Sequence, residues 1–251
     1  MAVRPGERSG ERTPARASPR TPGRRRTPLA RVRDGAFALV LSVVAAYFGA
    51  CFGLMAAYKI VYPPTTGVQI ERRVEALVSG ADYTKRYDPE LLDLITRHLP
   101  HAVVAAEDGR FYTHGGIDFE ALQEARRQAD RRGSAMRGAS TISQQLVKNL
   151  FLTTDRSLVR KAAEVPLTYA AEAILGKERI LDLYVNVIEW GPGVYGAEAA
   201  AQHHYGKAAA RLSRRESATL AALVPAPLAR TPRTVAWYRR LIERRMRAMG
   251  W

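Results

Sequence analysis

The longest hydrophobic stretch of the chain covers residues 36–58 and contains no charged side chain. As a helix it would be about 35 Å long, which is enough to cross a bilayer. A secretory signal peptide would have a shorter apolar region with a small-residue cleavage site close behind it. Here Lys59, Ile60, Val61 and Tyr62 follow instead, so we expect an uncleaved transmembrane anchor over residues 35–60.

Beyond the anchor, apolar residues recur mostly at helical spacing. Residues 68–78 and 89–99 show this spacing, and few segments alternate with period two. Residues 61–251 have about the length of one domain. We therefore expect a mainly α protein with a single N-terminal transmembrane helix and one helical domain over residues 61–251.

Start and stop signals place further helices along this domain. Thr141 with Gln144, and Ser213 with Glu216, match the capping box of a helix start. We expect Pro166 to interrupt a helix. The expected apolar faces are Ile142, Leu146 and Leu150 in one helix, Ile180, Leu181, Leu183 and Tyr184 in residues 176–186, and Trp237, Leu241 and Met249 in residues 235–249.

The net charge of +15 suggests an anionic partner, but ten arginines lie in the first 34 residues, among Pro, Gly, Ser and Thr. We expect residues 1–34 to be a disordered tail. The tail has no aromatic side chain for base stacking, so we expect no nucleic-acid partner. Under the positive-inside rule the tail is cytoplasmic, and residues 61–251 lie outside the cytoplasm.

Two adjacent carboxylates, Glu107 and Asp108, follow an apolar run at residues 102–106. Burying both is costly unless they are paired or used in chemistry. The alternative interpretation is a solvated acidic turn at a helix end, with Gly109 as the stop. These two residues are our first candidates for a catalytic site.

Polar residues at helical spacing follow downstream. Thr141, Gln145 and Lys148 share one helix face, and a charged set continues with Arg156, Arg160, Lys161 and Glu164. An ordinary polar face, and a surface ion pair between Arg160 and Glu164, are the alternatives.

Two other patterns argue against a dinucleotide-binding site and against a cysteine-based site. Gly191, Gly193 and Gly196 match GxGxxG, but the context is helical rather than a βαβ unit, so we expect a loop leading into a helix at residues 197–202. Cys51 is the single cysteine, which excludes an internal disulfide and a Cys-based zinc site.

Five ordered motifs give the chain a family resemblance. EDGRFYTHGG, GASTISQQLVKNLFL, RKAAE, KERILDLYVN and GVYGAEAAAQHHYGK resemble the successive motifs of family 51 glycosyltransferases. These peptidoglycan polymerases occur as the N-terminal module of class A penicillin-binding proteins and as free-standing enzymes. No SxxK, SxN or KTG transpeptidase set follows, so we expect a free-standing, monofunctional member.

The resemblance implies a lysozyme-like helical fold and assigns roles to residues. Glu107 is implied to be the catalytic base, and Glu164 the second essential carboxylate and a metal ligand. The implied cofactor is a divalent metal, Mg²⁺ or Mn²⁺. The residues implied to bind substrate or shape the cleft are Asp108, Phe111, His114, Ser140, Thr141, Gln144, Gln145, Lys148, Arg156, Arg160 and Lys161.

The implied substrates are lipid II and the lipid-linked glycan chain, at the bacterial inner membrane. A sugar hydroxyl is a weak nucleophile and needs a carboxylate to take its proton. A pyrophosphate leaving group needs cations rather than a protonated acid. The alternatives are a lytic, glycan-cleaving enzyme and a catalytically silent scaffold; cell-division or elongation proteins are the expected protein partners.

Overall fold

The computed structural model describes residues 28–134, 138–155 and 157–251. Its described residues divide into two units, with the boundary between Ala45 and Ala46. The disorder predicted for residues 1–27 and the role predicted for Arg156 lie outside the described residues. Residues 28–34, which the sequence placed in the tail, are helical.

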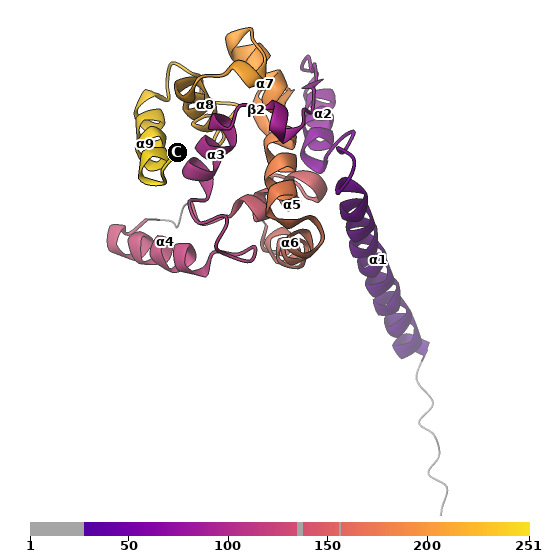
Figure 1. Ribbon diagram of the computed structural model, residues 1–251. Coiled ribbons are helices and arrows are strands. Elements are labelled where there is room, and N and C mark those ends of the chain that lie inside the picture. Colours follow the sequence, from indigo (N-terminus) through magenta and orange to yellow (C-terminus); the bar gives the residue numbers. More distant parts are fainter. Residues whose placement is uncertain (1–27, 135–137, 156) are drawn as a thin grey trace, which may run out of the picture. The chain divides into compact units, whose positions relative to one another are not determined.

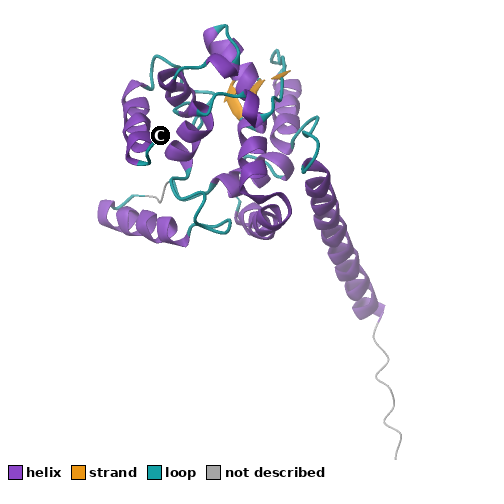
Figure 2. Ribbon diagram, viewed as in Figure 1, coloured by secondary structure: helices purple, strands orange, loops and turns teal. Residues whose placement is uncertain are grey.

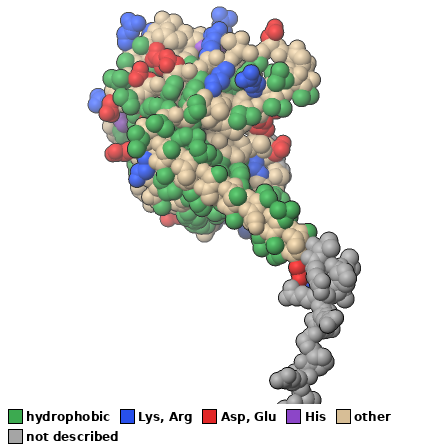
Figure 3. Space-filling view, turned by 90° about the vertical axis from the view of Figure 1, so that its right-hand side faces the viewer, with side chains coloured by type: hydrophobic (Ala, Val, Ile, Leu, Met, Phe, Trp, Pro, Cys, Tyr) green, Lys and Arg blue, Asp and Glu red, His purple; other side chains and the backbone are tan. Residues whose placement is uncertain are grey.

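The N-terminal helix α1 (Pro28–Tyr58) contains the long hydrophobic stretch. Its segment Arg33–Tyr58 is long and apolar enough to cross a membrane. Most of its large hydrophobic side chains are exposed, Phe37 and Leu39 each at 65%. Figure 3 shows hydrophobic side chains gathered along this helix. Such a surface is what a lipid-facing segment requires.

The described part of the chain is mainly helical, as the sequence predicted (Figures 1 and 2). The helices after α1 are α2 (Gly67–Ser79), α3 (His98–Glu107), α4 (Phe119–Arg132), α5 (Ile142–Phe151), α6 (Leu158–Val187), α7 (Ala197–Tyr205), α8 (Arg214–Ala221) and α9 (Ala236–Ala248). Two short 3₁₀ helices cover Leu92–Leu94 and Ala209–Arg211.

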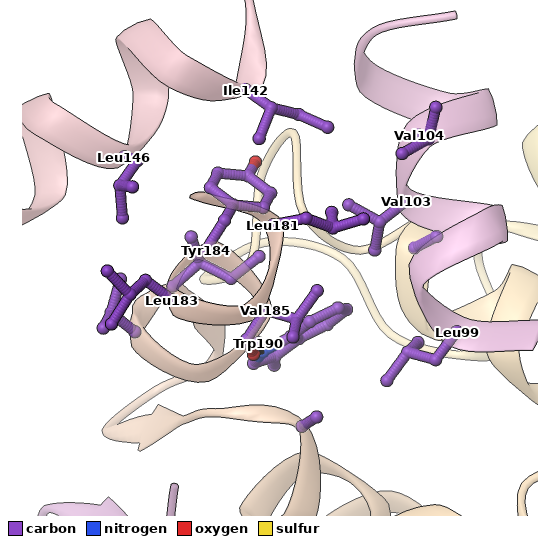
Figure 4. Close-up of a cluster of buried hydrophobic side chains, with 14 of the residues drawn as sticks. Leu99, Val103, Val104, Ile142, Leu146, Leu181, Leu183, Tyr184, Val185 and Trp190 are labelled. Atoms are coloured by element: carbon purple, nitrogen blue, oxygen red, sulfur yellow. Dashed lines mark hydrogen bonds between the residues drawn. The ribbon is translucent and has the colours of Figure 1, made fainter. Parts of the chain in front are cut away.

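One hydrophobic core joins α3, α5, α6, α7, α8 and α9 (Figure 4). Helix α5 packs against α6, and α3 packs against α8 and α9. The predicted stripe of Ile142, Leu146 and Leu150 is buried, and Trp190 is fully buried in the same core. Each such side chain contributes about 1.5–3 kcal/mol when removed from water. The core therefore fixes α3, α5 and α6, the helices that carry the candidate catalytic residues.

The predicted glycine loop is instead part of a small sheet. Strands β2 (Glu189–Gly191) and β3 (Val194–Tyr195) form a hairpin, and β1 (Arg86–Tyr87) pairs in parallel with β3. Gly196 has φ +88°, and a Cβ there would lie 2.8 Å from the Asn186 carbonyl oxygen. The glycine is therefore needed for close packing rather than for binding a dinucleotide.

Three helix predictions are wrong in detail. Residues 89–99 do not form one helix, because Asn186 binds both the N–H and the carbonyl of Glu90 and holds that backbone out of the helix. Helix α6 continues through the exposed Pro166, and its non-helical dihedral angles occur at Gly176. The buried face of α9 carries Ile242 and Met246, whereas Trp237 is 62% exposed.

The segment that leaves α1 is held tightly to the rest of its unit. Arg179 donates to the carbonyls of Tyr58 (2.7 Å) and Val61 (3.0 Å), and its guanidinium lies 4.6 Å from the centre of the Tyr62 ring. The Tyr62 hydroxyl donates to Asp182 (2.7 Å). Residues 58–62 are therefore a fixed joint rather than a free linker.

Candidate active site

Helix α3 delivers the two adjacent carboxylates. Residues 102–106 are buried on the core side, the helix ends at Glu107, and Asp108 is its C-terminal cap. Asp108 is only 6% exposed, and its Oδ2 accepts from the backbone N–H of Ile142 at 3.0 Å. The solvated acidic turn is therefore excluded for Asp108, which ties the end of α3 to the start of α5.

His114 completes this connection. Its Nδ1 accepts from the Gly116 N–H at 3.1 Å, so the proton on Nε2 is directed to the Asp108 carboxylate at 3.0 Å. Phe111 is fully buried, and the Lys177 ammonium lies 4.5 Å from the centre of its ring. Asp108, His114 and Phe111 thus frame the loop that follows Glu107.

The polar side chains at the start of α5 have two kinds of contact. Two of them hold the start of the helix, and one contacts the candidate base. Thr141 and Gln144 form the predicted capping box, and the Thr141 hydroxyl donates to the Gly116 carbonyl. Gln145 instead donates from Nε2 to Oε2 of Glu107 at 2.9 Å. Both capping side chains are engaged in holding the helix start, while Gln145 contacts the candidate base.

The second carboxylate lies among cations on α6. Glu164 is 2% exposed; its Oε2 accepts from Arg160 at 2.7 Å, and its Oε1 accepts from Lys161. Lys161 also contacts the exposed hydroxyl of Ser140 at 3.4 Å. The buried ion pair replaces the simple surface pair considered from the sequence.

Lys148 lies within the electrostatic reach of both carboxylates. Burial lowers the pKa of its ammonium, and the charges of Glu164 and Glu107 oppose that shift. The pKa of Glu107 is raised, first by burial; the hydrogen bond from Gln145 and the charge of Lys148 oppose the rise. A carboxylate with a raised pKa is a stronger base than an exposed one.

A cavity of about 970 Å³ opens beside Glu107 and Asp108. Its wall includes Ser140 and Thr141 together with residues of α4 and α9. Gln145, Lys148, Arg160, Lys161 and Glu164 are not part of this wall, so the structure brings the predicted residues together as two adjoining groups.

Helix α9 is a contribution that the sequence did not suggest. The Tyr238 hydroxyl donates to the Ala106 carbonyl at 3.1 Å, and Arg245 donates to the Ala105 carbonyl at 3.1 Å. These carbonyls lie in the last turn of α3, where a carbonyl has no N–H donor within its own helix. Nothing in the spacing of α9 distinguishes these two residues from a solvated basic face.

The surroundings of Glu164 do not fit a metal held by the protein. Both of its carboxylate oxygens accept from side-chain cations. The described residues contain no group of three or more His, Cys, Asp or Glu side chains that could share a metal ion. Mg²⁺ and Mn²⁺ favour several oxygen ligands. The divalent metal, with Glu164 as its ligand, therefore stays a prediction.

Comparisons with known proteins identify the family of the chain. The family model for transglycosylases matches residues 74–249. A biosynthetic peptidoglycan transglycosylase of Marinomonas sp. (strain MWYL1) is 40% identical over 197 residues, covering 77% of this chain and 83% of its own. Proteins of the same description from Caulobacter vibrioides (47% over 171 residues, covering 68% and 72%) and Herminiimonas arsenicoxydans (48% over 157 residues, covering 62% and 68%) are also similar.

The chain therefore belongs to the transglycosylase family. It is a glycosyltransferase whose described residues include one N-terminal helix able to span a membrane.

Asp108→Ala tests the structural connection at the cleft. The substitution removes the acceptor of the Ile142 N–H and of His114, so we expect the free energy of unfolding to fall by about 1–3 kcal/mol. Asp93→Ala, at an exposed carboxylate, should change it by less than about 0.5 kcal/mol. Thermal unfolding of the detergent-solubilised protein measures both; equal stability of the two variants would contradict the assignment.

Proposed function

We propose that this protein polymerises lipid II into β-1,4-linked glycan strands and releases undecaprenyl diphosphate during cell-wall synthesis. The observation that carries the proposal is Glu107, which lines the cavity, accepts from Gln145 and has a raised pKa. The biosynthetic peptidoglycan transglycosylases similar to this chain support the same reaction.

In the proposed reaction Glu107 takes the proton of the sugar 4-hydroxyl as its oxygen attacks the anomeric carbon of the lipid-linked chain. The bond from that carbon to the pyrophosphate oxygen breaks, and the electron pair leaves with the pyrophosphate. Direct displacement converts the α-linked donor into a β-linked product.

The cations beside the cavity suit the leaving group. Lys148, Arg160 and Lys161 surround Glu164, so a developing pyrophosphate charge would meet preorganised positive groups. A lytic enzyme expels an alkoxide and needs a protonated acid for it. The cationic group therefore favours synthesis over glycan cleavage.

The anchor gives the proposed reaction its location. A donor with a long lipid tail stays in the bilayer, and a membrane-spanning α1 would keep the cavity close to it. We place the tail in the cytoplasm and residues 61–251 outside the inner membrane, because the arginines precede the apolar stretch of residues 36–58. Cell-division or elongation proteins are the proposed protein partners at that surface.

Glu107→Gln tests the proposed base. Glutamine keeps the size of the side chain but cannot accept the hydroxyl proton, so we expect polymerisation of labelled lipid II to fall by about 10²–10⁴-fold. Glu75→Gln on the exposed face of α2 is the control and should polymerise at the wild-type rate. A Glu107→Gln variant with normal polymer yield would refute the proposed base.

The pH dependence of turnover tests the state of Glu107. Because burial raises its folded pKa above the ordinary 4.5, the carboxylate gains a proton, and loses its function as a base, at a pH above 4.5. The acidic limb of the kcat/KM profile should therefore have its midpoint above 4.5 and should be absent from the residual activity of Glu107→Gln. A wild-type midpoint at or below 4.5 would contradict this expectation.

Removal of the anchor tests the proposed location. On detergent-free liposomes that contain lipid II, a variant starting at Pro63 should polymerise at least about tenfold more slowly than the full chain, because it loses the local concentration at the membrane. Each liposome rate is divided by the same protein's rate in detergent micelles, because the variant also loses the buried side chains of Cys51, Met55 and Tyr58. Equal ratios for the two proteins would show that the anchor is not needed for access to substrate.

A further inference from the structure

Tyr184 is a fully buried polar side chain that the proposed reaction does not yet use. It lies on α6 among core residues, and the sequence placed it in an apolar set. Figure 4 shows its ring beside Leu146, Leu181 and Ile142, with the hydroxyl oxygen on the side of Ile142. A buried hydroxyl normally has a hydrogen-bond partner, so the identity of that partner is informative.

The partner of Tyr184 is the side chain that contacts the proposed base. Its hydroxyl donates to Oε1 of Gln145 at 2.7 Å, and Nε2 of Gln145 donates to Oε2 of Glu107 at 2.9 Å. Two hydrogen bonds thus connect a core residue of α6, through α5, to the carboxylate at the end of α3.

The direction of these bonds follows from the chemistry of the three groups. Burial raises the pKa of Tyr184 well above its ordinary value, so the hydroxyl keeps its proton and remains a donor. An amide has one accepting and one donating end. When the accepting end is taken by Tyr184, the donating end faces Glu107.

The reversed amide would be unfavourable on both sides. Its oxygen would face the carboxylate of Glu107, which can bind it only when protonated. The Tyr184 hydroxyl would lose its acceptor, and the part of the chain that the structure describes offers it no other. A buried donor without a partner is costly.

We propose that Tyr184 is a positioning residue: its hydroxyl fixes the Gln145 amide in the orientation that donates to Glu107 and so favours the ionised, proton-accepting carboxylate. The inference rests on the proposed role of Glu107 and deepens it. Tyr184 acts through Gln145 and does not touch the substrate.

Other groups also influence the charge of Glu107, and they remain in place when Tyr184 is changed. They are Asp108 beside it in the chain, Lys148 on α5, Arg230 after α8 and Tyr238 on α9. A change seen on removal of the Tyr184 hydroxyl alone therefore reports on the two hydrogen bonds.

The test is the pH profile of lipid II polymerisation by the full-length protein in detergent micelles. Tyr184→Phe should move the acidic midpoint of kcat/KM upward by about one pH unit, since a hydrogen bond to the ionised form is weakened. At a pH below the midpoint, the rate should fall about tenfold relative to wild type, while KM changes less than about twofold.

Tyr195→Phe is the matched control. Tyr195 is also fully buried, and its hydroxyl also bonds to side chains, donating to Glu189 and accepting from Tyr83, each at 3.3 Å. Loss of this hydroxyl should leave the midpoint at the wild-type value. A general effect of a missing buried hydroxyl would shift both variants alike and would overturn the proposal.

Gln145→Met is a second variant that tests the same proposal if Tyr184→Phe does not fold. It should raise the midpoint by at least as much, because Glu107 loses its donor. Where both variants fold, adding Tyr184→Phe to Gln145→Met should give no further shift, since the two residues act in series. An unchanged midpoint in Gln145→Met, or additive shifts in the double variant, would overturn the proposal.

The two proposals, the base role of Glu107 and the positioning role of Tyr184, would be refuted by different results. If Glu107→Gln still polymerises lipid II, the proposed base is wrong. If Glu107→Gln is inactive but Tyr184→Phe has the wild-type midpoint, the base stands and only the positioning role of Tyr184 is refuted.

Discussion

The hydrogen bonds of the Asp108 carboxylate hold three separate segments at one point: the end of α3, the loop through His114 and the start of α5. Charge-assisted bonds of this kind are short, directional and strong when buried. Glu107 is the residue immediately before this point, so its backbone position is fixed by its neighbour. The two adjacent acidic residues thus have different roles. Asp108 holds the three segments together, and Glu107 faces the cavity.

The second constraint on the site is that the buried charge of Glu164 must be paired with cations. Glu164 is a buried charge that two cations neutralise, and such a pair is costly to break because one uncompensated charge would remain buried. The same cations are those that a pyrophosphate would attract. The site therefore has a carboxylate that keeps its positive groups in place before any substrate arrives.

Sequence reasoning anticipated the helical class, the anchor, the capping boxes and the stripe of Ile142, Leu146 and Leu150, because each depends on local spacing. The family resemblance added the candidate residues. The small sheet and the docking of α9 depend on contacts between distant segments, which no local pattern encodes. Tyr184 shows this limit: by spacing it is a core residue, and only the fold reveals that its hydroxyl meets Gln145.

The fixed joint at residues 58–62 has a mechanical consequence. If residues 58–62 were a free linker, the end of α1 and helix α6 could move independently of one another. Arg179 and Asp182 instead hold the last turn of α1 and Tyr62 against α6, so that a displacement of this turn would also displace α6. The last turn of α1 is thus coupled to the helix that carries Glu164 and Tyr184.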